Sequence, residues 1–478
     1  MVFLFNYIKI AIWSGLYYFQ GKKSDIIMKI IINNIRDSGC VAIKFCQWIL
    51  PKLEAIYDID NSQENNKWFK DLEELYEECN YHNINHTKKI YYRSFNSQLD
   101  EDYEIISLIA SGSIGQVYKV KDKHTNTMCA MKVVHPDMQF QLLFFDYFIN
   151  ILYLVPFIRN IFNYYIPIEL KEFIKDFKIQ CDLINEANNC LRFYEEYKDN
   201  QLIIIPEIYR VSEKIMIMKY EEGGRIEDIN ISDYNIYKIL LLLKLFIKSN
   251  ELIFHLMHGD LHKGNWKVRI DDGIPKLVIY DFGFCWKVPK FIYSNLSKID
   301  NAFMNVQDNK EDTIKEFGKA CWYFINKKIP IEYMHKEIKI VKEETKLNYD
   351  DPSLLLKLII NCCRKYKFII DSFIIQSVIL HIQMQKNFEN YYITRPILEN
   401  NLDSLGFEYY NRRIHDIINL CKTYSVFDDY CKFLESEFIE EKVEIKELFG
   451  TIEKDNGLEK YDFLKELAIK DTNYNLNI

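Results

Sequence analysis

The chain has 478 residues, of which 49% are hydrophobic and 27% charged, and its formal net charge at pH 7 is −8. This hydrophobic content excludes a disordered or collagen-like protein, and the length allows two lobes with extensions. The mild acidity, without a basic patch interleaved with aromatic residues, argues against nucleic acid as a partner. Twelve cysteines without a C-x-x-C pair indicate a reducing compartment and argue against a structural zinc site.

Glycine is scarce, at 15 of 478 residues, so its positions are informative. Eight of the 15 lie between residues 112 and 283, and seven of these fall in motifs that suit a nucleotide site. The eighth, Gly273, lies in an Asp-Asp-Gly turn between two predicted strands and is expected to be structural.

Residues 1–25 form an apolar N-terminal segment interrupted by Asn6, Lys9 and Ser14. The segment is long enough to cross a bilayer but only marginally apolar enough. Neither a secretory signal nor an Arg-rich transit peptide is evident. Two interpretations stay open, a membrane anchor and an amphipathic or buried helix that docks on the fold, and the second is favoured.

Residues 26–100 are expected to form a helical extension. The apolar periodicity predicts a helix from about residue 24 to 36, a break with Gly39 as the C-cap, and a second helix that ends at Pro51. Helical character returns at residues 68–79, within an otherwise polar stretch.

Residues 101–222 are expected to form a small lobe. The alternation over residues 103–134 predicts two or three antiparallel strands with a glycine-bearing loop between the first two. Helices are expected from residue 138 to 199. The segments LIIIPEIY (202–209) and EKIMIMKY (213–220) are expected to form another strand pair.

Residues 223–400 are expected to form a larger helical lobe that includes a long helix from Ile236 to Leu256. Residues 401–478 alternate Glu and Lys, which is typical of a charged helical tail. The predicted fold is therefore α+β, with a small antiparallel-sheet lobe before a large helical lobe.

The segments HGDLHKGN (258–265) and DFG (281–283) carry the strongest chemical pattern. Transfer of a γ-phosphoryl group needs Mg²⁺ held by hard oxygen ligands and an aspartate that orients or deprotonates the acceptor. Asp260 suits the catalytic role, whereas Asn265 and Asp281 suit the metal. The pattern predicts a phosphotransferase that uses ATP or ADP with Mg²⁺.

A glycine loop lies where a phosphate-covering loop is expected, and Lys132 is on a following strand. Such a lysine reaches the α- and β-phosphates and needs a carboxylate to hold it, for which Glu186 is the candidate. Lys132 and Glu186 therefore join the predicted catalytic set. The loop residues predicted to bind nucleotide are Ala110, Ser111, Gly112, Ser113, Ile114, Gly115, Gln116 and Val117.

The segment before Gly223-Gly224 occupies the place of a kinase hinge in the order of motifs. Backbone groups of Lys219, Tyr220 and Glu221 are therefore predicted to contact the adenine.

The segments SIGQVY, MKVVHP, INEANNCLRF, HGDLHKGN and DFGF together resemble the UbiB-type (aarF-domain-containing) atypical kinase family. Lys44 to Gln47 resembles that family's K-x-G-Q motif, and the resemblance runs from about residue 26 to 400. It implies a protein-kinase-like bilobal fold in which Lys44 and Gln47 occupy space that a protein substrate would need. It also implies ATPase or phosphotransferase activity, a membrane lipid or isoprenoid-quinone precursor as partner, and a membrane-associated or mitochondrial location.

Three positions depart from the family pattern. Cys46 replaces the glycine of K-x-G-Q, and the E-x-D motif reads Gln180-Cys181-Asp182, which retains only Asp182 as a regulatory residue. The family's alanine-rich loop carries Gly112 here. Our hypothesis is that Gly112 brings this loop closer to that of an ATP-using kinase, because no side chain stands between the backbone amide and a phosphate.

Two alternatives stay open at this point. One is a small-molecule phosphotransferase of the aminoglycoside or choline kinase type, where the HGDLHKGN pattern is equally at home. The other is a nucleotide-binding regulatory pseudokinase without turnover, which the departures at Cys46 and Gln180 favour.

Overall fold

The computed structural model describes residues 2–20, 24–60, 81–165, 170–198, 202–229, 255–288, 313–344 and 352–382, with Pro167 and separate residues between 236 and 250. The predicted helix at residues 68–79 and the tail at 401–478 lie outside the described residues, as does most of the predicted helix from Ile236 to Leu256. The last residue of that predicted helix, Leu256, begins a strand instead.

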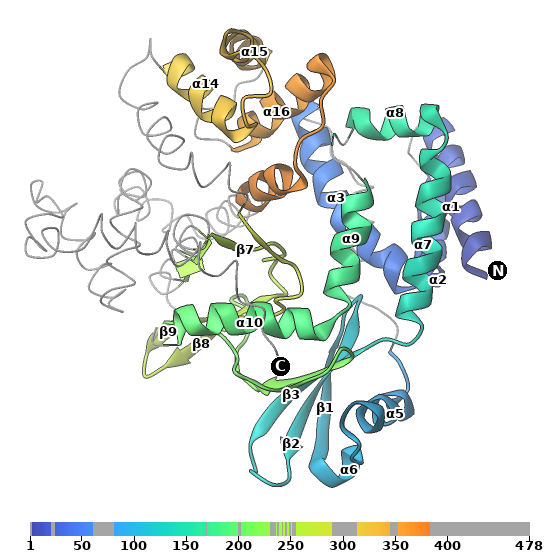
Figure 1. The fold of residues 1–478 in the computed structure, drawn as a ribbon, viewed down its shortest axis with the longest axis vertical. Coiled ribbons are helices and arrows are strands. Elements are labelled where there is room, and N and C mark those ends of the chain that lie inside the picture. The colour runs from blue at the N-terminus through green and yellow to red at the C-terminus, as the bar shows by residue number, and fades with distance from the viewer. Residues whose placement is uncertain are drawn as a thin grey trace, which may run out of the picture.

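An antiparallel five-stranded sheet forms the small lobe (Figure 1). The strand order is β1-β2-β3-β6-β5, and the predicted glycine-bearing hairpin joins β1 to β2. The strands are β1 (Tyr103–Ser111), β2 (Gly115–Asp122), β3 (Met128–Val134), β5 (Ile208–Val211) and β6 (Ile215–Lys219).

Alternate residues of the central strands enter two different cores, as the two-residue period of a strand requires. Met131 and Ile217 join a cluster with α5 (Ile84–Phe95) and α6 (Leu99–Asp102). Ala130 and Met216 belong to the larger cluster, which includes buried residues of α10. The helix α10 (Leu183–Tyr197) also contacts β5 and β6. The sheet is therefore covered on both faces.

Two smaller sheets follow. β4 (Ile203–Ile204) runs parallel to β9 (Ile274–Ile279), which pairs with β8 (Trp266–Asp271). β7 (Leu256–His258) pairs with β10 (Cys285–Lys287). The predicted strand pairing of LIIIPEIY is therefore only half right: β4 joins β9, and only β5 pairs with β6, because Pro206 separates the two short strands.

The predicted turn between β8 and β9 is confirmed. Asp272 and Gly273 have φ values of 52° and 80°, which suit the two-residue hairpin turn that requires positive φ at both positions. Nothing lies within 4 Å of a Cβ built on Gly273, so its backbone conformation alone explains the glycine.

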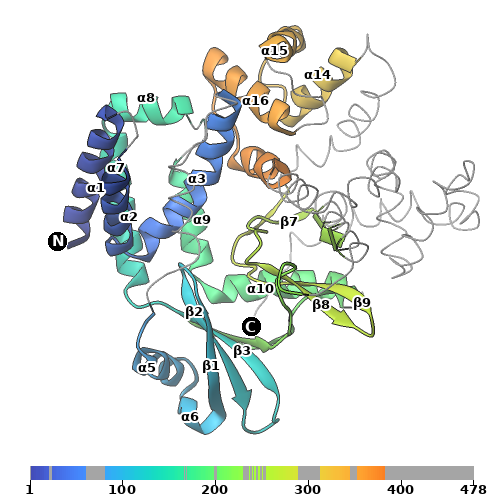
Figure 2. The ribbon, with the colours of Figure 1, turned by 180° about the vertical axis from the view of Figure 1, so that it is seen from behind.

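A group of helices stands beside the small lobe (Figures 1 and 2). Ser24 caps α2 through a 3.3 Å hydrogen bond that its hydroxyl accepts from the N–H of Ile27, and Gly39 has a φ of 89° at the predicted break. The group comprises α1 (Val2–Phe19), α2 (Asp25–Asp37), α3 (Cys40–Asp60), α7 (Met138–Tyr153), α8 (Pro156–Tyr165) and α9 (Leu170–Gln180).

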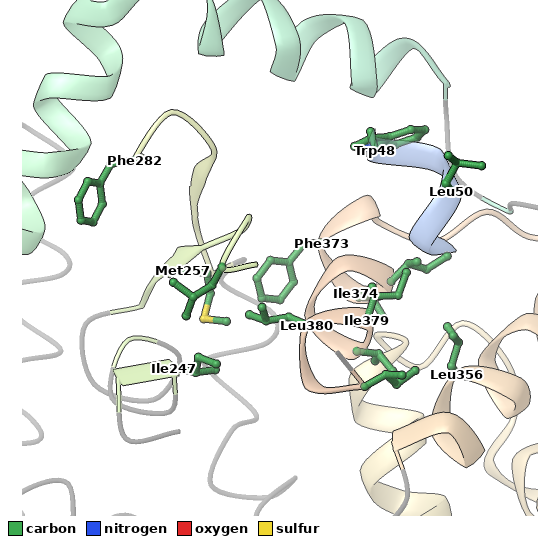
Figure 3. Packing of buried hydrophobic residues seen from close by; sticks show 14 of the residues in the cluster. Trp48, Leu50, Ile247, Met257, Phe282, Leu356, Phe373, Ile374, Ile379 and Leu380 are labelled. Carbon is green, nitrogen blue, oxygen red and sulfur yellow. The ribbon is translucent and has the colours of Figure 1, made fainter. Parts of the chain in front are cut away.

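The helix α3 continues beyond Pro51 to Asp60, so the predicted end at Pro51 is wrong. A proline inside a helix removes one backbone hydrogen bond and its ring crowds the carbonyl four residues earlier, and tertiary contacts on either side can compensate for that cost. Trp48 and Leu50 of α3 belong to the large buried cluster, as do Phe373 and Ile374 (Figure 3).

The helix α1 docks on the protein through one face. The ring of Tyr7 stacks on Phe148 of α7 at a centroid distance of 5.0 Å, and Asn6 Nδ2 donates a 3.1 Å hydrogen bond to the carbonyl of Asp37. None of the helices that the structure describes is both long and apolar enough to cross a membrane.

The large lobe is mainly helical beyond residue 312 in its described part (Figure 1). The helices are α14 (Thr313–Phe324), α15 (Ile331–Glu344), α16 (Pro352–Tyr366) and a final helix over residues 372–382. The helix α16 contacts α3, so the N-terminal extension reaches the large lobe as well as the small one. The α+β fold with a sheet lobe and a helical lobe is confirmed.

Candidate active site

Three elements bring Lys132, Glu186 and Asp281 together. Lys132 on β3 places its Nζ 2.8 Å from both carboxylate oxygens of Glu186 on α10, and 3.2 Å from Oδ1 of Asp281, which lies two residues after β9. Burial alone would lower the pKa of Lys132, but the carboxylates of Asp281 and Glu186 outweigh it and raise that pKa. Burial raises the pKa of Glu186 to about 7, against the pull of Lys132. Lys132 is thus a buried cation fixed by two acids.

The DFG segment is anchored to α10. The ring of Phe282 lies 5.0 Å from that of Phe193, and Asn189 Nδ2 donates a 3.0 Å hydrogen bond to the carbonyl of Phe282. Asp281 has a positive φ of 53°, a conformation uncommon outside glycine and often found at functional sites. Gly283 donates its N–H to Asp281 Oδ1 at 3.2 Å, which fixes the carboxylate.

Hydrogen bonds join the HGDLHKGN loop to the DFG segment. His258 is buried, and its Nε2 donates to the carbonyl of Tyr280 at 3.0 Å while its Nδ1 accepts from the N–H of Asp260 at 3.3 Å. Asn265 Nδ2 donates to the carbonyl of Asp260 at 2.7 Å, and the N–H of Tyr280 donates to the carbonyl of Asn265 at 2.8 Å. These bonds hold Asp260, Asn265 and Asp281 in one place.

Helix α3 contacts two of the predicted loops at once. Lys44 Nζ lies 3.1 Å from Asp260 Oδ2, and the hydroxyl of Ser113 donates a 3.0 Å hydrogen bond to Gln47 Oε1. Burial would raise the pKa of Asp260, but the ammonium of Lys44, together with His262 and His258, lowers it overall. Cys46, at the position of the family glycine, is packed against the large hydrophobic cluster, and burial raises the pKa of its thiol to about 12. The cysteine therefore does not keep α3 away from the site.

The two glycines of the loop differ in their surroundings. A Cβ on Gly115 would lie 2.4 Å from the backbone oxygen of Val133, so β2 and β3 can approach closely only with glycine there. A Cβ on Gly112 would meet only the carbonyl oxygen of Gly115, at 3.8 Å. Gly112 is therefore the open tip of the loop.

The remaining loop residues are mostly enclosed. Ser111, Ser113, Ile114 and Gln116 are buried, Val117 is half-buried and Ala110 is exposed. Gln116 directs its side chain to the α5 side of the sheet, where its Oε1 accepts a 2.8 Å hydrogen bond from the N–H of His82. The side chain of Gln116 therefore binds His82 and does not point toward Lys132.

The predicted hinge has partners of its own. The N–H groups of Lys219 and Tyr220 donate to the carbonyls of Glu207 and Met128, at 2.8 and 3.1 Å. The Glu221 carboxylate pairs with Lys219 and with Arg269, whose Nη1 lies 2.7 Å away.

Tyr280 connects this hinge to the DFG segment. Its hydroxyl donates a 2.9 Å hydrogen bond to the Glu221 carbonyl, and Tyr280 directly precedes Asp281. Neither Tyr280 nor Arg269 was predicted from the sequence. The one signal for Tyr280 in the sequence is its place directly before the DFG segment.

Asp182 and Gln180 lie at the junction of α9 and α10. Asp182 Oδ1 accepts a 3.0 Å hydrogen bond from the N–H of Ile184 and so caps α10, the helix that carries Glu186. Gln180 is buried, and its Oε1 has no hydrogen-bond partner among the described residues.

Asn265 and Asp281 fit Mg²⁺ in the presence of a phosphate. The amide nitrogen of Asn265 is engaged by Asp260, which leaves its side-chain oxygen as the remaining donor to a metal, and Asp281 contributes a carboxylate. Among the described residues, no group of three or more His, Cys, Asp or Glu side chains could hold a metal ion. A pair of hard oxygen ligands suits Mg²⁺, which proteins usually bind through one or two such side chains together with substrate phosphates.

The chain is similar in sequence to several known proteins. The chain is 27% identical over 252 residues to the probable serine/threonine-protein kinase abkC of Dictyostelium discoideum, covering 51% of this chain and 35% of the relative. It is 23% identical over 292 residues to the ABC1 family protein MCP2 homolog of Schizosaccharomyces pombe, covering 55% and 49%. It is 25% identical over 218 residues to the probable protein kinase UbiB of Cronobacter sakazakii, covering 43% and 39%. The matched regions thus span less than half the length of these relatives.

A structure of Rv3197 from Mycobacterium tuberculosis, solved as a complex with erythromycin, is similar at 17% identity and a TM-score of 0.40, covering 56% of this chain and 67% of that one. The model of the ABC1 atypical kinase-like domain matches residues 74–316, which contain Lys132, Glu186, Asp260 and Asp281. The chain therefore belongs to the ABC1 atypical kinase-like family.

Proposed function

We propose that the protein binds ATP or ADP with Mg²⁺ and transfers or hydrolyses the γ-phosphate. The observation that carries the proposal is the contact of Lys132 with Glu186 and Asp281, from three separate elements, at 2.8 and 3.2 Å. A buried lysine held by a helical glutamate beside the DFG aspartate is the arrangement that positions nucleotide phosphates in protein kinases.

Each residue of the site has a distinct proposed role. Lys132 binds the α- and β-phosphates, and Glu186 holds Lys132 in place. Asp260 orients or deprotonates the acceptor, and its carboxylate is ionised because Lys44 lowers its pKa. Asn265 and Asp281 hold Mg²⁺, which neutralises charge on the phosphates when bound.

The N-terminal helix α3 would regulate access to this site. Lys44 occupies one oxygen of Asp260, and Gln47 occupies the hydroxyl of Ser113 in the glycine loop. Both contacts lie where an acceptor and a phosphate would approach. We propose that α3 excludes a bulky protein acceptor and that a small or lipid acceptor, or water, is used instead.

Preference for ATP over ADP is proposed to depend on Gly112. The space around this residue accepts a methyl group, so a Gly112→Ala variant should fold normally. If the open tip lets an amide approach the γ-phosphate, Gly112→Ala should weaken ATP binding relative to ADP. Equal relative affinities in wild type and variant would contradict the proposal.

Membrane lipid or an isoprenoid-quinone precursor is the proposed partner, at a mitochondrial or other organelle membrane. Relatives include the UbiB kinase and a chloroplastic Arabidopsis kinase that is 26% identical over 194 residues. α1 and α7 also carry apolar stripes at helical spacing that face solvent. The stripe residues are Phe5, Ile8, Ile12, Leu16 and Phe19 on α1, and Phe140, Leu143, Tyr147 and Ile151 on α7, with Leu154 directly after α7.

The stripes can be tested with phospholipid vesicles. Wild type should float with the vesicles, and the double variant Ile12→Asp/Leu143→Asp should remain in the soluble fraction while unfolding at the wild-type temperature. Flotation of both proteins alike would contradict a lipid role for these faces.

The activity is tested with γ-labelled ATP, Mg²⁺ and liposomes. Release or transfer of label that falls at least about 100-fold in Asp281→Asn supports the proposed function. Label found only on a soluble small molecule would instead indicate an aminoglycoside- or choline-kinase-like enzyme. A nucleotide-dependent rise in melting temperature without any release would indicate a regulatory pseudokinase.

A further inference from the structure

A chain of hydrogen bonds runs from the tip of the glycine loop into α5. His135 Nε2 lies 2.9 Å from the carbonyl oxygen of Gly112, and His135 Nδ1 lies 2.9 Å from His82 Nδ1. The other nitrogen of His82 lies 2.9 Å from Thr87 Oγ1, which is 3.0 Å from the hydroxyl of Tyr118. Two imidazoles and two hydroxyls thus form one continuous relay.

Elementary bonding rules fix where each proton lies. A carbonyl oxygen can only accept, so His135 carries its proton on Nε2. The Nδ1 of neutral His135 then accepts, which requires His82 to donate from its own Nδ1. The Nε2 of His82 therefore accepts from the Thr87 hydroxyl, which in turn accepts from Tyr118.

Burial keeps both rings neutral. Burial is the largest effect and lowers the pKa of His82 to about 4, with further lowering from His135 and His86. Burial also lowers the pKa of His135, although the Gly112 carbonyl opposes that shift. A proton on either ring would set two donors against each other at the 2.9 Å contact.

Gln116 closes the relay at its far end. Its Nε2 donates to the hydroxyl of Tyr118, and its Oε1 accepts from the N–H of His82 at 2.8 Å. His86 is the neighbouring ring, with its centroid 4.9 Å from that of His82, but its Nε2 donates to the carbonyl of Val134 at 3.2 Å. His86 therefore lies beside the relay without taking part in it.

The relay determines how the loop tip presents its backbone. The carbonyl of Gly112 and the N–H of Ser113 belong to one planar trans peptide group and point in opposite directions. When His135 holds the carbonyl, the N–H of Ser113 must face away from His135. Among the described residues nothing accepts a hydrogen bond from this N–H, whereas Gln47 contacts the hydroxyl of the same serine.

We propose that His135 is a positioning residue of the nucleotide site, which holds the Gly112 carbonyl so that the N–H of Ser113 is directed at a phosphate. His82 supports it by fixing the tautomer of His135. The inference rests on the proposed function, since it assumes that this loop covers the phosphates of a nucleotide.

The test measures the affinity of the full-length protein for a fluorescent ATP analogue with Mg²⁺. His135→Phe removes the donor to Gly112 and should weaken binding about tenfold, the loss expected for one hydrogen bond to a charged phosphate. His135→Gln can still donate to the same carbonyl and should bind within about threefold of wild type. His86→Phe, the matched control, should bind like wild type.

If His135→Phe does not fold, the variant His82→Phe gives a second measurement, because it no longer fixes the tautomer of His135. His82→Phe leaves His135 free to move its proton to Nδ1, and it should bind more weakly than wild type but more tightly than His135→Phe. In addition, NMR of the protein labelled with ¹⁵N-histidine should find the Nε2–H tautomer for His135 and the Nδ1–H tautomer for His82.

The outcomes separate the two proposals. A wild-type protein that binds no nucleotide overturns the proposed function, while the tautomers still report on the relay. Wild-type affinity in His135→Phe, failure of His135→Gln to recover affinity in a protein of normal melting temperature, or the opposite tautomers would each overturn the positioning role.

Discussion

Two lysines enter the same site, and they are held in different ways. Lys132 has 7% of its side chain exposed and contacts two acids, Glu186 and Asp281, that belong to the kinase-like part of the chain. Among the described residues, Lys44 forms an ion pair with one acid, Asp260, whose side chain is 33% exposed. Lys44 also comes from α3, outside the matched residues 74–316.

The difference suggests that Lys132 stabilises the fold of the site, whereas Lys44 regulates access to it. The Lys132 contacts link a strand, a helix and the DFG segment, so that removing them disturbs the small lobe and the site together. The Lys44 contact links one partly exposed carboxylate to helix α3, and its loss leaves no fully buried acid without a cation. We expect substitutions at the first lysine to change stability and substitutions at the second to change activity.

Lys132→Met should have the largest effect on stability. The substitution leaves the buried Glu186 and the partly exposed Asp281 without their cation, so the free energy of unfolding should fall by about 3–5 kcal/mol. The additional change Glu186→Gln should restore part of this loss, because it removes one of the unpaired charges. Denaturant-induced unfolding measures both, with Lys121→Met on β2 as a control that should stay within about 0.5 kcal/mol of wild type.

The glycine loop shows a similar contrast, between the tightly packed Gly115 and the more open Gly112. Gly115→Ala forces a methyl group against the backbone of Val133 and should lower the free energy of unfolding by about 1–3 kcal/mol. Gly112→Ala should change it by less than about 0.5 kcal/mol. Equal losses in thermal or denaturant unfolding would mean that the loop tip is as constrained as its base.

Lys44→Met should lower the free energy of unfolding by less than about 1 kcal/mol, much less than Lys132→Met, because the pair is partly exposed. Phosphate release should instead rise severalfold, since the carboxylate of Asp260 is freed for the acceptor. Gln47→Leu provides a comparison, as it removes the bond to Ser113 while leaving Lys44 on Asp260. A fall in the rate for Lys44→Met would show that Lys44 assists catalysis.

The pH dependence of the Lys44 variant sharpens the comparison. Lys44 lowers the pKa of Asp260, so in wild type this aspartate stays ionised and stabilises the folded state until the pH falls well below 4. Without Lys44 the folded pKa should rise, and activity should be lost at a higher pH on the acidic side. Superimposable acidic limbs of the rate profiles would contradict this assignment.

The sequence was sufficient for features that depend on local pattern and order. The strand alternation predicted the β1–β3 hairpins, and the order of motifs predicted that Lys132, Glu186 and Asp281 would meet. The Asp-Gly turn at Gly273 needed only backbone preferences.

Contacts between residues that are far apart in the sequence could not be predicted in this way. Gly259 lies in the HGDLHKGN motif, yet a Cβ there would overlap the ring of Trp286, 27 residues later. The relay from His135 to His82 joins residues 53 apart, and nothing in either local pattern marks the partner. Propensity favours a helix end at Pro51, whereas contacts of α3 with α7 and α16 sustain the helix.

Calorimetric titration of the full-length protein with ATP, with and without Mg²⁺, tests the central claim most directly. We predict binding that depends on Mg²⁺, is lost in Asp281→Asn, and is retained in Asp271→Asn. In this control the aspartate pairs, among the described residues, with Arg269 and Lys276 of its own β8–β9 hairpin. Binding that is equally strong without Mg²⁺, or that survives Asp281→Asn unchanged, would contradict a nucleotide site built on Lys132, Glu186 and Asp281.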